Sequence, residues 1–312
     1  EFAPNSLLRF IELLHEADLP PGVVNLVNGR GPVTGQALTS HPGVDVIGFI
    51  GGTATGSAIM SSAAATIKKV GLELGGKSAN IVLASADFEQ AVDGSLLAIL
   101  TGSGQQCLAG SRILIERPIA DEFVEQFTAR MRNIRIGDPF DADTELGPMA
   151  FAAHRDKVLS YVGIAESEGA KLLCGGKAAE GFGDGYFIEP TAVMAASNQS
   201  RVCQEEIFGP FASLLIVDSV DEAVRIANES DFGLVSYLWS RDLPTVMDAA
   251  RRIQAGTVWV NTPLARDLRA PFGGYKQSGL GRDGLQASVE LMTEEKTMMV
   301  PTGTLNLPKL GA

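Results

Sequence analysis

Apolar residues recur along the first part of the chain with two alternating spacings. Residues 6–17 carry them three and four positions apart, the spacing of an amphipathic helix, and residues 23–27 form a short apolar run typical of a strand. Residues 34–40 are expected to be helical, residues 44–50 to form a second strand, and a further helix to begin at Ser57. Strands that alternate with helices in this way favour a parallel sheet with helices on both faces.

A similar alternation begins after residue 79. Residues 80–83 are strand-like, and Asp87 followed by Gln90 is typical of a helix start whose capping side chain accepts a backbone hydrogen bond. Further strands are expected at residues 113–115 and 257–261, and further helices at residues 121–132, 161–169 and 221–229. The predicted fold class is therefore α/β, with open parallel sheets and helices on both faces.

Composition narrows the class of protein. With 312 residues, 45% hydrophobic and 20% charged, the chain can bury a large core and is expected to hold more than one domain. Its net charge of −12 argues against a nucleic-acid or anionic-membrane partner. Three irregularly spaced cysteines favour a reducing, cytoplasmic compartment, and no cysteine or histidine pair has metal-site spacing. No apolar run approaches the roughly 20 residues that span a bilayer.

One cysteine stands apart from the other two. Cys107 lies in a polar, glycine-rich run, where Gly104 and Gly110 can bring backbone amides close to a substrate. Cys174 ends an apolar strand-like run and is expected in the core, and Cys203 precedes a charged segment. A lone cysteine usually behaves as a small buried hydrophobe. The surroundings of Cys107 therefore favour a nucleophile there over a packing role.

Glu73 is a candidate general base. It stands between Leu72 and Leu74, and an apolar neighbourhood raises the pKa of a carboxyl group. A thiol and such a carboxylate are a nucleophile and a base, so covalent catalysis is expected if the fold brings Cys107 and Glu73 together.

Three glycine motifs compete for a phosphate-binding role. Residues 71–78 match the phosphate-loop pattern G-x-x-x-x-G-K-[ST], but the strand expected after them is not the helix that such a loop requires. Residues 279–284 match G-x-G-x-x-G without a preceding strand. Residues 51–56 have the required order of strand, tight turn and helix start, so we expect their amides to hold a pyrophosphate.

Five motifs occur together in one order along the chain. They are FIGGT (49–53), LELGGKS (72–78), GQQC (104–107), EEIFGP (205–210) and PFGGYKQSG (271–279). In this order and spacing the chain resembles the aldehyde dehydrogenase superfamily from Glu1 to about Val300. The resemblance implies oxidation of an aldehyde to a carboxylic acid with hydride transfer to NAD, with NADP possible. It also implies a partial Rossmann-like cofactor domain beside a complete α/β catalytic domain.

The resemblance implies a role for each matching residue. Cys107 would attack the aldehyde carbonyl as a thiolate to form a thiohemiacetal, and hydride loss would leave a thioester. Glu73 would activate the water that hydrolyses this thioester. Glu206 would bind the nicotinamide ribose and Phe208 would pack near the ring, although an ordinary solvated acidic pair would also explain Glu205 and Glu206. The other cofactor-side residues would be Gly51, Gly52, Thr53, Gly56 and Leu74.

The resemblance also suggests how cofactor and substrate are selected. Glu1 aligns with a glutamate that can bind the adenosine ribose, and a carboxylate there favours NAD because it repels the 2′-phosphate of NADP. On the substrate side we expect Asn261 at a strand end, followed by a loop with Arg266 and Arg269. Two arginines would suit a carboxylated semialdehyde. A solvated loop with Asp267 between the arginines is the plainer alternative.

The expected domain organisation follows the family. Residues 1–74 would be the remaining part of the NAD-binding domain, residues 75–270 the catalytic domain, residues 271–290 a return to the NAD-binding domain, and residues 291–312 an oligomerisation strand and tail. The chain begins without methionine, inside a helical pattern, as if cut through a domain. Family members have an N-terminal portion that supplies an oxyanion-hole asparagine, and the complete protein is expected to be a homodimer or homotetramer.

Two other functions stay open. In the first, the chain is an inactive fragment with a structural or interaction role. In the second, it is a hydrolase that uses Cys107 and Glu73 on esters or thioesters without a cofactor.

Two departures from the family bear on the site. Residues 101–103 replace an aromatic residue and an asparagine, and Gly52 replaces a common serine at the phosphate site.

Overall fold

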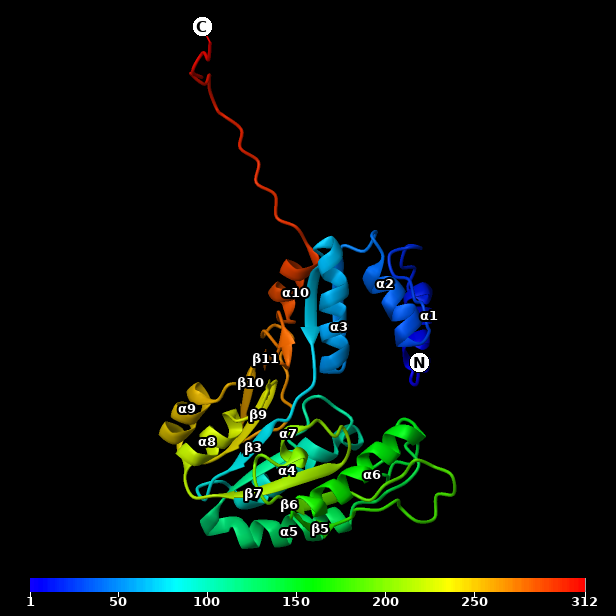
Figure 1. Cartoon of the computed structure of the whole chain (residues 1–312), viewed down its shortest axis with the longest axis vertical. Helices are drawn as coiled ribbons and strands as arrows, with labels where there is room; N and C mark the ends of the chain where they lie inside the picture. The colour runs from blue at the N-terminus through cyan, green and yellow to red at the C-terminus, as the bar shows by residue number, and fades with distance from the viewer. Residues whose placement is uncertain (312) are drawn as a thin grey trace.

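Two β-sheets divide the structure. The computed structural model describes residues 1–311, and Figure 1 shows a large sheet with its helices below a smaller sheet flanked by α3 (Thr53–Ala63) and α10 (Leu285–Met292). The chain passes from the small sheet to the large one through residues 74–78, which lack regular secondary structure. Residues 293–311 extend away from both sheets.

The large sheet has seven strands within the described residues, in the order β10-β9-β3-β4-β7-β6-β5. Neighbouring strands run parallel, except that β5 is antiparallel to β6. The strands are β3 (Ala79–Val82), β4 (Arg112–Glu116), β5 (Lys171–Cys174), β6 (Thr191–Met194), β7 (Phe211–Val217), β9 (Val235–Trp239) and β10 (Thr257–Val260).

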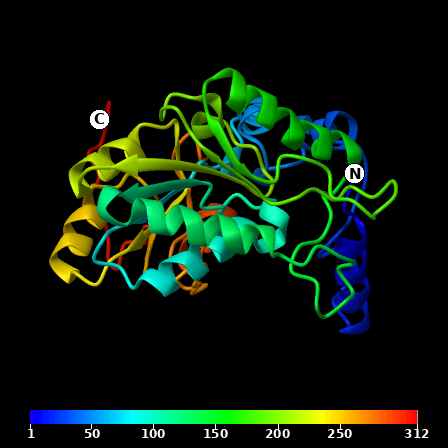
Figure 2. The ribbon, with the colours of Figure 1, turned by 90° about the horizontal axis from the view of Figure 1, so that it is seen from below.

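Helices cover both faces of the large sheet (Figure 2). Consecutive strand residues point to opposite faces, so Ile113 and Ile115 lie in one apolar core while Leu114 lies in the other. Burial of both faces explains why these strands are continuous apolar runs rather than alternating ones. The helices are α4 (Phe88–Leu100) and α5 (Ala120–Arg132) on one face, and α6 (Ala152–Ser167), α8 (Val220–Asn228) and α9 (Leu243–Arg252) on the other.

The small sheet has three strands within the described residues. It contains β1 (Val46–Ile50), β2 (Lys69–Glu73) and β12 (Gly279–Leu280), with β1 parallel and β12 antiparallel to β2. On one face, α3 contributes to a small apolar cluster of Ile47, Ile59 and Ala63. On the other face, α10 places Leu291 against Gly71 of β2.

Shorter elements connect or flank the two sheets. The N-terminal segment contains α1 (Asn5–Glu16), a π-helical turn (Gly31–Gly35) and α2 (Gln36–Ser40). The remaining elements are α7 (Arg201–Gln204), the β8 (Phe232–Gly233) and β11 (Tyr275–Lys276) pair, and the 3-10 turns Ala64–Thr66, Thr101–Gly104 and Arg117–Ile119.

Most predicted elements are confirmed, and so is the α/β fold class. Asp87 caps α4, because its side chain accepts a hydrogen bond from the Gln90 amide at 3.3 Å. The strand predicted at residues 23–27 is wrong. This stretch is not extended into a sheet, and Val23 and Val27 are 63% and 62% exposed. No strand of residues 1–311 pairs with it, and an apolar run becomes a strand only where a neighbour can accept its backbone hydrogen bonds.

Two helices begin earlier than predicted. α3 begins at Thr53 rather than Ser57, and α6 begins at Ala152 rather than residue 161. Residues 152–157 at the start of α6 include four polar residues in a row and none that is buried, so they carry no apolar periodicity that a reading of the sequence could detect. The domain boundaries at residues 74, 270 and 290 stay predictions. In the described part of the chain, no helix combines the length and the apolar character needed to cross a membrane.

Candidate active site

Cys107 follows a strained turn between α4 and β4. Gly102 and Ser103 have left-handed backbone conformations, with φ of 61° and 57°. A left-handed serine is uncommon, so the packing around the turn must hold it in place. Gly104, with φ of 67°, abuts the backbone carbonyl of Gly209 so closely that a side chain would clash. The turn leaves the Cys107 thiol half-buried near the amino end of β4.

The linker between the two sheets packs its backbone against the thiol segment. A Cβ atom on Gly76 would lie 2.6 Å from the carbonyl oxygen of Cys107, and one on Gly75 would lie 2.5 Å from the Glu206 carboxylate. The Gly76 amide donates a hydrogen bond to Glu206 Oε1 at 3.0 Å. Glycine at these two positions therefore lets one peptide segment contact both Cys107 and Glu206.

Glu73 ends β2 and brings a carboxyl group from the small sheet to the same junction. Its side chain is 9% exposed, and within residues 1–311 its Oε2 atom has no hydrogen-bond partner. Burial raises the pKa of Glu73 to about 7, and the Asp283 carboxylate adds to the rise while Arg282 and Arg266 oppose it. Near neutral pH the group is therefore divided between its acid and base forms, which suits a general base.

The Cys107 thiol shares this electrostatic environment. Burial raises the pKa of Cys107, and the Glu206 and Glu73 carboxylates raise it further, whereas its own backbone amide and Arg266 lower it. The thiol is therefore protonated at neutral pH, and a base must accept its proton before the sulfur can attack a carbonyl. The fold thus brings together the two residues that the sequence singles out, and their chemical roles stay predictions.

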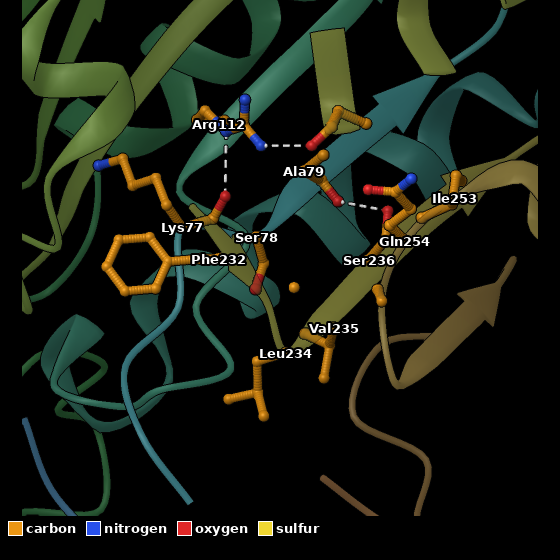
Figure 3. Close-up of a pocket in the computed structure, with 13 residues that line it drawn as sticks. Lys77, Ser78, Ala79, Arg112, Phe232, Leu234, Val235, Ser236, Ile253 and Gln254 are labelled. Carbon is orange, nitrogen blue, oxygen red and sulfur yellow. Dashed lines mark hydrogen bonds between the residues drawn. The ribbon is translucent and has the colours of Figure 1, made fainter. Parts of the chain in front are cut away.

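Lys77 and Ser78 complete the phosphate-loop pattern but are buried below the junction (Figure 3). Lys77 is 2% exposed, and burial lowers its pKa to about 8. Ser78 lines a cavity of about 10 Å³, which has room for a single water molecule. The strand β3 follows these residues, so they lack the exposed helix terminus that a phosphate loop needs.

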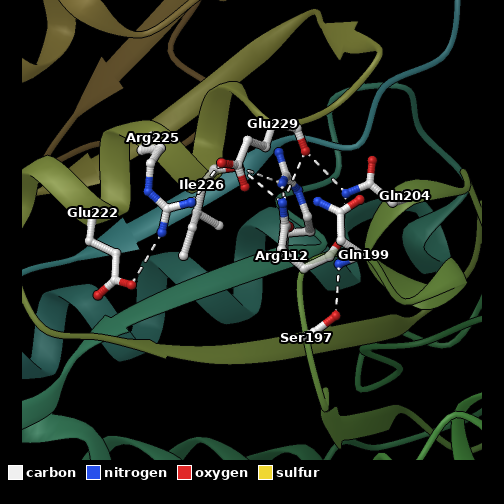
Figure 4. A network of polar contacts seen from close by, with 9 residues as sticks. Arg112, Ser197, Gln199, Gln204, Glu222, Arg225, Ile226 and Glu229 are labelled. Atoms are coloured by element: carbon white, nitrogen blue, oxygen red, sulfur yellow. Dashed lines mark hydrogen bonds and ion pairs between the residues drawn. The ribbon is translucent and has the colours of Figure 1, made fainter.

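Arg112, the first residue of β4, lies in a network of polar contacts that includes Ile226 of α8 (Figure 4). Its side chain is 1% exposed, so each of its donors needs a partner. The guanidinium donates hydrogen bonds to the carbonyls of Lys77 at 3.0 Å, Ile226 at 2.9 Å and Ala227 at 2.9 Å, and to Asn198 Oδ1 at 2.8 Å. These bonds tie the start of β4, five residues after Cys107, to the end of α8.

The predicted phosphate-binding residues form the turn between β1 and α3. Gly51 follows β1, Gly52 precedes α3, and Thr53 is the first residue of the helix. Gly56 packs so tightly on Leu74 that a Cβ atom would lie 2.6 Å from the leucine side chain. The amides of the first helical turn have no partners inside the helix, so this turn can accept a phosphate.

The acidic pair before β7 is split between two environments. Glu205 forms an ion pair with Arg201 at 2.7 Å, whereas Glu206 turns toward the Gly76 amide. Burial raises the pKa of Glu206, and the hydrogen bond from Gly76 opposes this rise. Phe208 has a left-handed φ of 64° and is 36% exposed. A solvated pair therefore describes Glu205 but not Glu206.

Glu1 lies in the N-terminal segment beside α1 and α2 (Figure 1). Its carboxylate accepts a hydrogen bond from the Gly31 amide at 3.3 Å. The next residue, Phe2, stacks on Phe151 with ring centres 3.8 Å apart, so the start of the chain is tied to the large sheet through α6. The ribose-binding role of Glu1 stays a prediction.

Asn261 lies at the far end of the large sheet from the thiol. Its Oδ1 accepts a hydrogen bond from the Ser240 amide at 2.9 Å, and its Nδ2 donates to the Ser240 carbonyl at 2.7 Å. The parallel register places Asn261 beyond the carboxyl ends of β9 and β10, whereas Cys107 precedes the amino end of β4. The Asn261 amide thus joins two strand ends, and its expected role on the substrate side stays a prediction.

The two loop arginines also differ. Arg269 is 82% exposed and forms an ion pair with Asp267 at 2.7 Å. This exposed pair favours the plainer alternative of a solvated loop at Arg269, and its expected place on the substrate side stays a prediction. Arg266 instead lies over the ring of Phe272, 5.0 Å from the ring centre.

Phe272 contacts both Arg266 and the apolar cluster against which Cys107 packs. Phe272, Leu264 and Cys107 all pack against one apolar cluster that contains Tyr237 and Trp259. Arg266 lowers the pKa of both Cys107 and Glu73, as expected for a cation close to the two groups. A positive charge thus lies at the edge of the apolar cluster against which Cys107 packs.

Reading the sequence missed one face of α6. His154, Lys157, Val158 and Tyr161 follow the spacing of neighbours on a helix surface, and all four contact residues 205–209. The spacing is visible in the sequence, but the partner segment lies about fifty residues away, so local pattern alone could not pair them.

Comparisons with known proteins agree with this geometry. The profile of the aldehyde dehydrogenase family matches residues 1–298. This chain belongs to that family. It is 42% identical over 298 residues to a betaine aldehyde dehydrogenase of Bacillus subtilis, covering 95% of this chain and 61% of the relative. It is 40% identical to a 2-aminomuconic 6-semialdehyde dehydrogenase of a Pseudomonas species, over 94% of this chain and 61% of the relative.

Solved structures show the same fold. The HpcC protein of Thermus thermophilus superposes with a TM-score of 0.95 at 39% identity, over 99% of this chain and 61% of that one. A betaine aldehyde dehydrogenase of Staphylococcus aureus, solved in complex with NAD⁺, gives a TM-score of 0.90 at 40% identity, over 92% of this chain and 57% of that one. The chain thus spans about three fifths of the length of the family members it matches.

Proposed function

We propose that the protein oxidises an aldehyde to a carboxylic acid with NAD as the hydride acceptor. One observation carries the proposal. The small sheet contributes a buried carboxyl group at Glu73, the large sheet contributes the half-buried thiol of Cys107, and the Gly75–Gly76 linker holds the two sheets together between them. A nucleophile and a base with a near-neutral pKa are what a covalent acyl-transfer route requires.

In the proposed reaction, the Cys107 thiol gives its proton to solvent water and its sulfur bonds to the aldehyde carbon, forming a thiohemiacetal. The Cys107 backbone amide stabilises the oxyanion that forms. When bound, NAD supplies the hydride acceptor, and the thiohemiacetal becomes a thioester. Glu73 then removes a proton from water, the hydroxide adds to the thioester, and the carboxylic acid leaves as the thiol is restored.

The residues on the cofactor side fit a dinucleotide. The amides at the start of α3 suit its pyrophosphate, and the close contact between Gly56 and Leu74 lets the helix approach the sheet there. Glu206 offers a carboxylate oriented by Gly76, which suits a ribose hydroxyl. NAD rather than NADP is proposed because the Staphylococcus aureus relative was solved with NAD⁺. The cytoplasmic location and the homo-oligomer stay predictions.

Arg266 favours an aldehyde that carries a negative charge. Asp267 is paired with Arg269, and Arg266 lies over Phe272 at the edge of the apolar cluster that includes Cys107. A carboxylate at the far end of the substrate would gain a charge-assisted hydrogen bond from Arg266. The trimethylammonium group of betaine aldehyde would be repelled. We therefore propose a semialdehyde substrate, as the name of the Pseudomonas relative describes for that protein.

Absorbance of reduced nicotinamide tests the proposed activity. Purified complete protein should reduce NAD in the presence of aldehydes, and Cys107→Ser should lower kcat by at least ~10³-fold because the nucleophile is lost. Cys174→Ala, at a cysteine buried in the core, is the matched control and should retain activity. Ester turnover without NAD that disappears in Cys107→Ser would favour the hydrolase alternative, and no turnover by the 312-residue chain alone would favour the inactive fragment.

Substrate preference tests the role of Arg266. We expect kcat/KM for a carboxylated aldehyde such as succinic semialdehyde to exceed that for betaine aldehyde. Arg266→Gln should reduce this preference by roughly 10-fold to 100-fold, the range expected for a charge-assisted hydrogen bond. Arg269→Gln is the control, since its charge is already paired with Asp267. A preference that survives Arg266→Gln would remove Arg266 from the substrate site.

A further inference from the structure

One face of α6 contacts four residues of the segment that carries Glu206 and Phe208. The contacting residues are His154, Lys157, Val158 and Tyr161, which lie on one side of the helix. Tyr161 donates its hydroxyl to Glu205 at 2.7 Å, Lys157 donates to the Glu206 carbonyl at 3.3 Å, His154 Nε2 lies 2.7 Å from the Phe208 carbonyl oxygen, and Val158 would lie 2.8 Å from a Cβ atom on Gly209.

The contact between His154 and Phe208 differs from the others because it acts on an unfavourable backbone conformation. Phe208 has φ of 64°, a left-handed value that bulky residues rarely adopt without support from their surroundings. The carbonyl that accepts from His154 belongs to this same residue, and the two rings lie 5.9 Å apart. Burial lowers the pKa of His154, so its ring is neutral at neutral pH and must carry its proton on Nε2 to donate this bond.

The segment transmits this geometry to the thiol. Glu206, two residues before Phe208, accepts the hydrogen bond from Gly76, and Gly76 abuts the Cys107 carbonyl. On the other side of Phe208, the Gly209 carbonyl abuts Gly104 in the strained turn that precedes the nucleophile. A shift of the Phe208 backbone would therefore move both the carboxylate on the cofactor side and the turn that supports the thiol.

We propose that His154 is a positioning residue for the cofactor side of the site. By donating a hydrogen bond to the Phe208 carbonyl, it holds Phe208 in the left-handed conformation and keeps the Glu206 carboxylate directed at Gly76. His154 acts through the backbone of Phe208 and need not touch a reacting atom. This proposal rests on the proposed NAD-dependent function, since it assigns residues 206 and 208 to the cofactor side.

The test compares three replacements of His154 in the complete protein. His154→Gln keeps a side-chain donor, His154→Phe keeps an aromatic ring without a donor, and His154→Leu keeps neither. Titration calorimetry gives the Kd for NAD, and steady-state kinetics give kcat and the two KM values. We expect the Leu and Phe variants to weaken NAD binding at least ~5-fold with the aldehyde KM within twofold of the original, and the Gln variant to bind NAD nearly normally. Ser160→Leu, at an exposed position of the same helix, should change nothing.

A double-mutant cycle isolates the backbone effect. Glycine adopts the left-handed conformation freely, so in a Phe208→Gly background the His154→Leu change should alter NAD affinity less than twofold. An equal effect in both backgrounds, or a Gln variant as impaired as the Leu variant, would overturn the proposal. So would a Leu variant that binds NAD normally. If the unaltered protein itself binds no NAD and reduces none, the proposed function fails instead, and the two failures are thus distinguishable.

Discussion

The two sheets differ in how completely their strands are buried. In the large sheet, Ile113, Leu114 and Ile115 of β4 are 0% exposed and apolar cores cover both faces. In the small sheet, Ile47 is the one buried residue of β1, and Ile50 is 73% exposed. The candidate nucleophile Cys107 lies at the fully packed sheet, and the candidate base Glu73 lies on the small one. The site therefore depends on the junction between a rigid body and a more weakly stabilised one.

Large-to-small substitutions should expose this difference most strongly. Phe123, which is 0% exposed in the core between α5 and the large sheet, should lose ~3–5 kcal/mol of stability as Phe123→Ala. Phe49 is only partly buried against the small cluster below α3, and Phe49→Ala should cost about 1 kcal/mol. Urea denaturation of both variants measures the two values. Equal losses would mean that the small sheet is as well packed as the large one.

The candidate base gives a smaller, pH-dependent effect. The pKa of Glu73 is about 7 in the folded chain, above its value in an unfolded chain, so folding favours the protonated form. The stability that this group contributes is complete at acid pH, below its unfolded pKa, and is lost as the pH rises through about 7. The melting temperature of Glu73→Gln should therefore increase relative to that of the unaltered protein as the pH rises from about 5 to about 8.

Glu205 offers a matched control for that trend. Its pKa is lowered, first by the hydrogen bonds from Arg201, so its charged form stabilises the folded chain at neutral pH. Glu205→Gln should then lose stability relative to the unaltered protein as the pH rises through the usual glutamate range. If both variants follow the same trend, the environment of Glu73 is not the apolar one described.

The features that could be predicted from sequence are those set by short-range pattern. Residues 113–115 form a buried strand because their apolar run is continuous, and Asp87 caps a helix because its oxygen reaches a nearby amide. Cys107 and Glu73 could be singled out because each stands in an unusual local context. The same reasoning failed at residues 23–27, where apolar residues form no strand, since pairing depends on a neighbour that sequence pattern does not reveal.

Features that depend on distant partners escaped prediction. Sequence pattern does not reveal that the Asn261 amide bonds to Ser240 at the end of the neighbouring strand. His154 looked ordinary, because Phe208 meets it only through the packing of α6 on residues 205–209. A left-handed conformation at a phenylalanine has no sequence signal at all, since the surrounding structure imposes it.

The timing of NADH formation in Glu73→Gln is the most direct measurement of whether the two sheets contribute separate chemical steps. Stopped-flow mixing of the complete protein with NAD and aldehyde should show a burst of about one NADH per site, because Cys107 and hydride transfer remain intact. The steady rate that follows should fall by roughly 10²-fold to 10⁴-fold, since the base that activates water is gone. If the burst disappears together with the steady rate, Glu73 acts at or before hydride transfer, and the assignment of nucleophile and base to separate steps is wrong.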